Sequence, residues 1–194
     1  MTRLLLEALS RKGETAVGFK PFACGDRADA EQLLAASSPN PASLDEVNPV
    51  YLKTPAAPMA AALIENRRLD IDAVRAAGEA LAERYRHVLV EGAGGWEVPI
   101  CDGLAMSDFA AEIGAPVLVV VDNRLGALNA TILTVNAVRA RGLPLAGLVL
   151  NHVTDERDIA SISNRAMLES LLDPPLIIDL LHGENELEWP FDEG

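Results

Sequence analysis

The sequence has no long apolar run, only two cysteines, and fewer basic than acidic residues. The longest purely apolar run, 115–121, is far shorter than the roughly 20 residues that a membrane-spanning helix needs. The two cysteines, Cys24 and Cys101, form neither a metal-binding spacing nor a disulfide framework, which is typical of a reducing cytoplasm. A formal net charge of −13 disfavours binding to nucleic acid or to an anionic membrane. We therefore expect a cytoplasmic protein whose partners are small molecules.

Common hydrolase signatures are also missing. His87, His152 and His182 have no mutual spacing suited to metal binding, and the sequence holds no GxSxG segment and no Cys–His arrangement. The sequence therefore gives no support for a hydrolase.

The sequence does contain an alternation of strand-like and helix-like segments. Strands are predicted at 15–20, within 87–92, at 115–121 and at 145–150. Helices are predicted from the beginning of the chain up to Gly13 and at 28–36, 72–86, 128–141 and 159–172. The strands are continuous apolar runs rather than alternating ones, which indicates a sheet that is covered on both faces. We predict a doubly wound α/β fold with a mostly parallel sheet and helices on both faces.

Domain organisation is predicted to be simple. Residues 1–194 are expected to form one domain, because no repeat or linker interrupts them and a chain of this length can bury one core. The prolines between 38 and 58 are expected to prevent regular structure there. The acidic end, 183–194, is expected to be a mobile tail.

Polar residues follow the predicted strands at the places where a parallel sheet binds its ligands. Lys20 ends the first strand and could meet an anion, although it could also be a surface lysine beside a turn. Glu91 ends the strand VLV and is followed by glycines, whose backbone N–H groups can approach a phosphate. A carboxylate there is a candidate magnesium ligand; the alternatives are a helix cap or a buried ion pair.

Two further residues have both a functional and a structural interpretation. Asp29 lies at the start of a predicted helix, where a carboxylate could bind a metal or merely stabilise the helix N-terminus. Asn151 ends the strand LAGLVLN and could hydrogen-bond a nucleotide base or cap the next element.

Taken in order, several segments resemble dethiobiotin synthase, and together they span most of the chain up to Asp155. They are GFKPFACG, the segment around Asp29, DEVNPVYLKTPAAP, VLVEGAGGWEVPI, PVLVVVDNRLGALNATILT and LAGLVLNHV. The resemblance implies a P-loop NTPase-like fold and an ATP-dependent cyclo-ligase of biotin biosynthesis. Such an enzyme joins carbon dioxide to 7,8-diaminononanoate and closes a ureido ring with release of ADP and phosphate. The resemblance also implies a homodimer that uses Mg²⁺ as cofactor and ATP as co-substrate.

The resemblance also implies roles for individual residues. Lys20 would contact the carbamate and the γ-phosphate, Asp29 and Glu91 would hold magnesium, and Glu91 and Asn151 would take part in nucleotide binding. Substrate binding would fall to Cys24, which stands where the family has a serine, to the loop Gly92, Ala93, Gly94 and Gly95, and to the loop Gly126, Ala127, Leu128 and Asn129, which receives the substrate carboxylate across the dimer interface.

Besides Cys24, the sequence departs from the family at two further places. The GxxxxxGKT phosphate loop that follows the first strand in the family is not found, and Met1 aligns just beyond it. We therefore expect Met1 to be an internal methionine of a longer protein. The segment IIDLLHGENELEW also lacks the family's GEIPW-like pattern, which contacts the nucleotide.

Two alternatives stay open at this point. One is a catalytically silent relative that keeps only a binding or dimer surface. The other is a ParA-like or MinD-like switch ATPase, which shares this sheet and loop chemistry. A switch ATPase is expected to offer a basic or amphipathic surface for DNA or membrane, and the sequence shows neither.

The 194-residue chain is expected to bind ATP weakly or not at all, because a phosphate loop supplies most of the contacts to the phosphates. Isothermal titration calorimetry with MgATP measures this directly. Tight binding would contradict the importance assigned to that loop.

Overall fold

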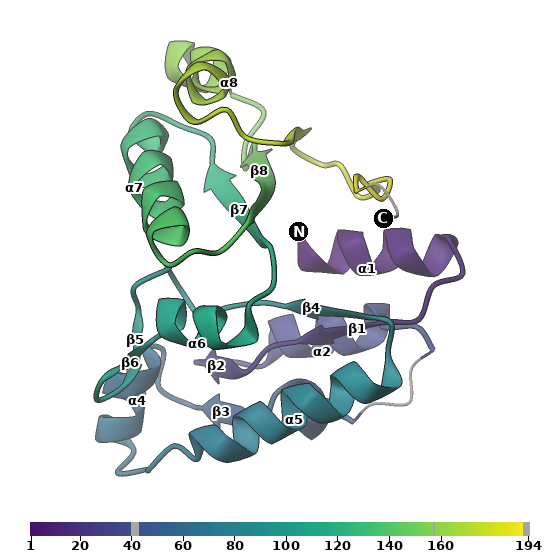
Figure 1. Ribbon diagram of the computed structural model, residues 1–194, viewed down its shortest axis with the longest axis vertical. Coiled ribbons are helices and arrows are strands. Elements are labelled where there is room, and N and C mark those ends of the chain that lie inside the picture. The colour runs from purple at the N-terminus through teal and green to yellow at the C-terminus, as the bar shows by residue number, and fades with distance from the viewer. Residues whose placement is uncertain (40–42, 157, 192–194) are drawn as a thin grey trace. The chain divides into compact units, whose positions relative to one another are not determined.

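The computed structural model describes residues 1–39, 43–156 and 158–191. The chain forms two compact units. The first comprises Met1–Met106 together with Asn185–Gly194, and the second comprises Ser107–Glu184. Figure 1 gives the elements and their labels.

The first unit opens with helix α1 (Thr2–Arg11), which buries a row of leucines and one alanine. It is followed, after its C-cap Lys12, by Gly13, whose φ of +78° suits a residue without a side chain after a helix. Strand β1 (Ala16–Phe19) follows and is buried throughout, as a central strand of a layered fold must be.

Strand β1 pairs in parallel with β4 (His87–Val90), and helices cover both faces of the pair. Their register places Phe19 opposite Val90. On one face, the backbone of Gly18 approaches Leu33 of helix α2 (Ala28–Ala36) and Leu6 of α1. On the other face, Phe19 packs against Gly78 of helix α5 (Ile71–Arg84). The helices predicted on both faces of a parallel sheet are thus present in this unit.

The proline-rich segment between 38 and 58 carries more regular structure than its composition predicts. Helix α3 (Leu44–Val47) begins at Ser43, which forms a capping box with Glu46. Strand β3 (Val50–Leu52) then pairs in parallel with β2 (Phe22–Cys24). The expectation of no regular structure was wrong, because the prolines flank these short elements and leave their hydrogen bonds intact; Pro41 lies outside the described residues.

The remaining elements of the first unit were not predicted. They are α4 (Pro58–Ile64) and the antiparallel hairpin β5 (Pro99–Cys101) and β6 (Leu104–Ala105), after which α6 (Met106–Ile113) begins. The described part of the C-terminal segment also belongs to this unit. Arg11 donates a hydrogen bond to the carbonyl of Leu187, and the ring of Trp189 lies 5.9 Å from that of His87. Mobility of this segment stays a prediction.

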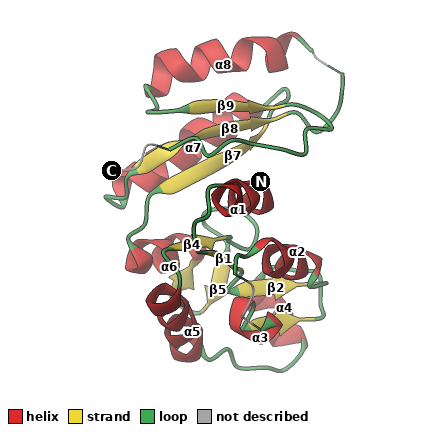
Figure 2. Cartoon of the chain, turned by 90° about the vertical axis from the view of Figure 1, so that its right-hand side faces the viewer, coloured by secondary structure: helices red, strands yellow, loops and turns green. Residues whose placement is uncertain are grey.

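The second unit is a parallel three-stranded sheet, with β8 (Leu145–Asn151) between β7 (Val117–Asp122) and β9 (Ile177–Leu180). Helix α7 (Ala127–Ala140) connects β7 to β8, and helix α8 (Ile159–Leu172) connects β8 to β9 (Figure 2). Both helices contribute to one core with the sheet, formed by Val121, Ala127, Val135, Leu148, Leu150, Leu168 and Leu172.

The predicted fold class is confirmed, because helices alternate with mostly parallel strands in both units. Helices 28–36 and 159–172 were predicted with their observed bounds. The structure has two compact units. That they form a single domain stays a prediction. Among the described residues, no helix combines the length and the apolar character that crossing a membrane requires.

Gly18→Ala is expected to lower the free energy of unfolding by about 1–3 kcal/mol, as overpacking of a close contact does. A Cβ at Gly18 would lie 2.6 Å from the Cβ of Leu33, so helix α2 would have to move. Chemical denaturation measures the change. Gly95→Ala is the matched control, because a Cβ there meets nothing within 4 Å, and equal effects of the two substitutions would contradict the close packing.

Candidate functional site

Lys20 follows the last residue of β1 and is buried, with a side chain that is only 9% exposed. Its backbone is fixed from the neighbouring segment. The N–H of Lys20 donates to the carbonyl of Val47, and the buried Asn48 amide donates to the carbonyl of Lys20 at 2.8 Å. The lysine therefore leaves the strand in a fixed direction and is not a surface residue beside a turn.

The ammonium group of Lys20 has three polar neighbours, which matches its three N–H donors. Nζ lies 2.7 Å from Oε1 of Glu91, 3.1 Å from the carbonyl oxygen of Gly92 and 3.3 Å from Oδ2 of Asp29. Two carboxylates and one carbonyl thus face the same point. A buried ammonium is stable in such an environment because its charge is paired and its donors are used.

The parallel pairing of β1 and β4 brings Glu91 to Lys20. Since Phe19 pairs with Val90, the residues that follow the two strands are neighbours, and the N–H of Glu91 donates to the carbonyl of Phe19 at 2.8 Å. The Glu91 side chain is 29% exposed, so the Lys20–Glu91 pair is partly shielded from water. The buried ion pair and the ligand role proposed for Glu91 are therefore compatible.

The glycine loop after Glu91 lies directly beside this pair. Gly92 supplies a carbonyl to Lys20, and Gly94 has a φ of +73°, which a residue with a side chain rarely adopts. Gly95 has open space around the position of a Cβ. The loop therefore presents backbone next to the ammonium group, and the approach of its N–H groups to a phosphate stays a prediction.

Asp29 lies in the first turn of α2, and its side chain is 64% exposed. It contacts Lys20, while Asp26 accepts a hydrogen bond from the N–H of Ala28 at the start of the helix. The carboxylate of Asp29 is thus directed toward the lysine and not only toward the helix end.

Cys24 ends β2 and is half-buried. Burial raises the pKa of its thiol, the nearby carboxylate of Glu65 raises it further, and Lys20 acts in the opposite direction. The thiol is therefore a neutral group near the lysine.

The other predicted binding residues lie in the second unit. Gly126 has a φ of +95° and precedes the first turn of α7, which holds Ala127, Leu128 and Asn129. Leu125 next to it is 76% exposed. Asn151 ends β8, where its carbonyl accepts a hydrogen bond from the N–H of Asn123. That these residues share one site with Lys20 stays a prediction.

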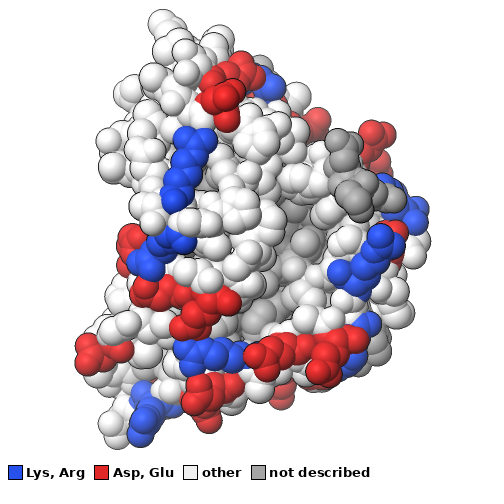
Figure 3. Space-filling view, viewed as in Figure 1, with Lys and Arg blue, Asp and Glu red and all other residues white. Residues whose placement is uncertain are grey.

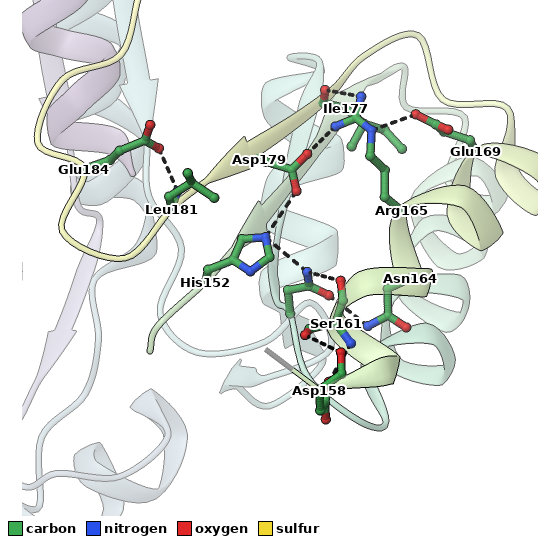
Figure 4. A network of polar contacts seen from close by, with 11 residues as sticks. His152, Asp158, Ser161, Asn164, Arg165, Glu169, Ile177, Asp179, Leu181 and Glu184 are labelled. Atoms are coloured by element: carbon green, nitrogen blue, oxygen red, sulfur yellow. Dashed lines mark hydrogen bonds and ion pairs between the residues drawn. The ribbon is translucent and has the colours of Figure 1, made fainter. Parts of the chain in front are cut away.

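A polar cluster at the carboxyl end of the second unit's sheet was not predicted from the sequence. His152 and Asn123 are buried there and contact one another. His152 also contacts Asp179 (Figure 4). The spacing of the three histidines indicated only that they do not bind one metal together, and no other role was predicted for His152. The position of His152 directly after a strand was the signal that could have identified it.

No group of three or more His, Cys, Asp and Glu side chains that could hold a metal occurs in the described parts of the chain. The magnesium ligands predicted from the sequence are two, Asp29 and Glu91. The two carboxylates and the ammonium group of Lys20 together carry a net charge of −1. This net negative charge favours the binding of a further cation.

Comparisons with known proteins agree with one another. A family model described as an AAA domain matches residues 1–180. A protein of Akkermansia muciniphila named ATP-dependent dethiobiotin synthetase BioD is 45% identical over 185 residues, which is 95% of this chain and 86% of that protein. Proteins with the same name from Aromatoleum aromaticum and Anaeromyxobacter dehalogenans are each 42% identical, over 89% and 86% of this chain and 80% and 76% of their own lengths. These matches do not favour a switch ATPase or a silent relative.

The two ion pairs of Lys20 are expected to differ in strength. A double-mutant cycle with Lys20→Gln and Glu91→Gln should give a coupling energy of about 1–3 kcal/mol, as for hydrogen bonds to charged groups with limited exposure. The cycle with Asp29→Asn should give less than about 1 kcal/mol, because Asp29 is mostly exposed. Chemical denaturation of the variants provides both values, and equal couplings would contradict the shielding inferred for Glu91.

Proposed function

Because the chain belongs to the family of ATP-dependent dethiobiotin synthetases, we propose that it closes the ureido ring of dethiobiotin from 7,8-diaminononanoate, carbon dioxide and ATP, with release of ADP and phosphate. This activity makes it a ligase of biotin biosynthesis. The observation that carries the proposal is the buried ammonium of Lys20, which is held by Glu91, Gly92 and Asp29 where β1 and β4 end. Ligands of open α/β folds bind at this edge of the sheet.

The proposed chemistry needs positive charge at one place. Carbon dioxide and one amine of the substrate form a carbamate, and a carbamate oxygen attacks the γ-phosphorus of ATP, so that ADP leaves. Negative charge develops on the transferred group, and a fixed ammonium stabilises it without a covalent bond to the protein. The second amine then attacks the carbamate carbon, which expels phosphate and closes the ring.

Lys20 can meet an incoming oxygen by exchanging one of its three partners. The contact to Asp29 is the longest, at 3.3 Å, and Asp29 is the most exposed of the side chains around the ammonium group. We expect a carbamate oxygen to replace it, while Glu91 and Gly92 keep the ammonium group in position. The released carboxylate of Asp29 is then available to another cation.

Magnesium is the cation that fits this donor set. Asp29 and Glu91 supply carboxylate oxygens, which are the ligands that Mg²⁺ prefers, and Mg²⁺ commonly combines one or two carboxylates with phosphate oxygens and water. When bound, the ion would neutralise charge on the phosphates. Glu91 would then take part in nucleotide binding through the metal.

The remaining predicted residues surround the substrates in the proposal. The backbone of Gly92, Ala93, Gly94 and Gly95 would line the diamine and phosphate pocket together with Cys24. The backbone N–H groups of Gly126, Ala127, Leu128 and Asn129 would receive the substrate carboxylate, and the amide of Asn151 would contact adenine. The left-handed conformation of Gly126 at the start of α7 supports an anion site there, because the first N–H groups of a helix attract negative charge.

We also propose a cytoplasmic homodimer that binds neither nucleic acid nor membranes. The net charge of −13 supports the last two points. On the face drawn in Figure 3, basic and acidic side chains of the described residues lie interspersed. Free Cys24 and Cys101 suit a reducing compartment, and the exposed Leu125 beside the carboxylate loop suits a dimer contact.

The proposed function is tested with protein expressed from its full open reading frame. With MgATP, bicarbonate and 7,8-diaminononanoate, we expect phosphate release that depends on the diamine, and dethiobiotin detected by mass spectrometry. Lys20→Gln should lower kcat about 100–1,000-fold, as the loss of a charge-stabilising donor does. Glu91→Gln should raise the Mg²⁺ concentration needed for half-maximal rate.

Lys12→Gln is the matched control, because Lys12 is exposed at the end of α1 and should leave the rate unchanged. Phosphate release that is indifferent to the diamine would indicate a switch ATPase instead. Absence of turnover with all substrates present would indicate a silent relative.

A further inference from the structure

Three polar side chains meet at the carboxyl end of the second unit's sheet, one from each strand region. Asn123 directly follows β7, His152 directly follows β8, and Asp179 lies in β9. The segment that leaves β7 leads to Gly126–Asn129 at the start of α7, and Asn151 is the last residue of β8, next to His152. The cluster therefore lies at the base of both predicted binding loops.

Both polar atoms of the buried Asn123 side chain have hydrogen-bond partners. Its Nδ2 donates to the carbonyl of Ser161 at 3.0 Å and lies 3.3 Å from Nε2 of His152, while its Oδ1 accepts from Asn164 at 2.8 Å. Its backbone N–H donates to the carbonyl of Asn151 at 3.0 Å. One side chain thus connects the ends of β7 and β8 with the first turns of α8.

The loop after β7 is fixed by the same group of residues. The amide of Asn164, which is buried, donates both to Asn123 and to the carbonyl of Arg124 at 3.3 Å. Asp158 caps α8 by accepting from the N–H of Ser161, a hydrogen bond that lowers the pKa of the Asp158 carboxyl. The start of α8 is therefore a firm support for the segment that leads to Gly126.

Nε2 of His152 lies near one donor and one acceptor. In a given tautomer it can form a hydrogen bond with only one of the two. Nε2 lies 3.1 Å from Oδ1 of Asp179, an acceptor, and 3.3 Å from the amide nitrogen of Asn123, a donor. Asp179 is partly exposed and is also paired with Arg165, whereas Asn123 is buried. An unused buried donor costs more than a solvated acceptor. We therefore expect Nε2 to accept a hydrogen bond from Asn123, with the ring proton on Nδ1.

We propose that Asn123 and His152 are positioning residues, which lock the loops after β7 and β8 to the start of α8 and so hold the binding segments Gly126–Asn129 and Asn151 in place. This inference rests on the proposed function, because it assigns the substrate carboxylate and the adenine to those segments. Apolar side chains of similar size could fill the same space. Unlike apolar side chains, the hydrogen-bonded polar cluster also fixes the orientation of the two loops.

The experiment compares three substitutions in protein expressed from its full open reading frame. His152→Leu removes the acceptor for Asn123, His152→Gln restores an acceptor oxygen, and His182→Leu changes an exposed histidine as a matched control. We expect His152→Leu to raise the KM values for ATP and for the diamine about 10-fold, which corresponds to about 1.4 kcal/mol of binding free energy each. Its kcat should change less than about twofold, and His152→Gln should recover most of both KM values.

Hydrogen exchange of the free protein gives a second readout that needs no turnover. His152→Leu should speed the exchange of backbone amides in 124–129 and 151–154 and leave those in 119–121 and 148–150 unchanged. Nitrogen NMR of the wild-type protein should show the ring proton of His152 on Nδ1. If His152→Leu does not fold, Asn123→Ser, which is too short to reach His152, carries the same expectations.

The two proposals fail in different ways. Absence of diamine-dependent turnover in the wild-type protein would overturn the proposed function, and the exchange data would still test the positioning of the loops. The positioning proposal is overturned if loop exchange and both KM values match the wild type, if only the unfolding temperature falls, or if the ring proton of His152 is on Nε2.

Discussion

The arrangement of the first unit depends on the buried ammonium of Lys20. A positive charge in such a place requires compensating groups at fixed positions, and these come from two separate segments, one with Asp29 in α2 and one with Glu91 and Gly92 directly after β4. The parallel register of β1 and β4 is what brings Glu91 to it, and Asn48 fixes the backbone of the lysine. A shift of the register would move Glu91 away from the lysine and leave both charges without their partner.

The second unit has uncharged amides and one histidine in a similar place. Asn123, His152 and Asn164 are buried where the parallel strands end, and each is hydrogen-bonded. Both units thus combine apolar strands with a small number of polar side chains that follow them. In the first unit these side chains carry charge and suit chemistry on anions; in the second they suit the orientation of loops. This division agrees with the roles that we propose for the two sets of residues.

Much of the fold could be predicted from the sequence, because helices such as α1 and α5 follow apolar periodicity and the strands are short apolar runs. The proximity of Lys20 and Glu91 followed from the rule that parallel strands end at one edge. The pairing of β2 with β3 could not be predicted in this way, since it depends on a three-residue contact between segments whose composition indicates loops. The Asn123–His152 contact could not be predicted either. Its two residues are separated in the sequence by a helix and a strand, and they belong to no common motif.

The crystal structure of the protein with 7,8-diaminononanoate, bicarbonate and Mg²⁺ bound would test the central claim most directly, namely that Lys20 marks the reacting centre of a dethiobiotin synthetase. We predict a carbamate oxygen within hydrogen-bond distance of Nζ of Lys20, in the place of Asp29, and a metal ion held by Asp29 and Glu91. A carbamate bound elsewhere, with Lys20 still paired to both carboxylates, would contradict it.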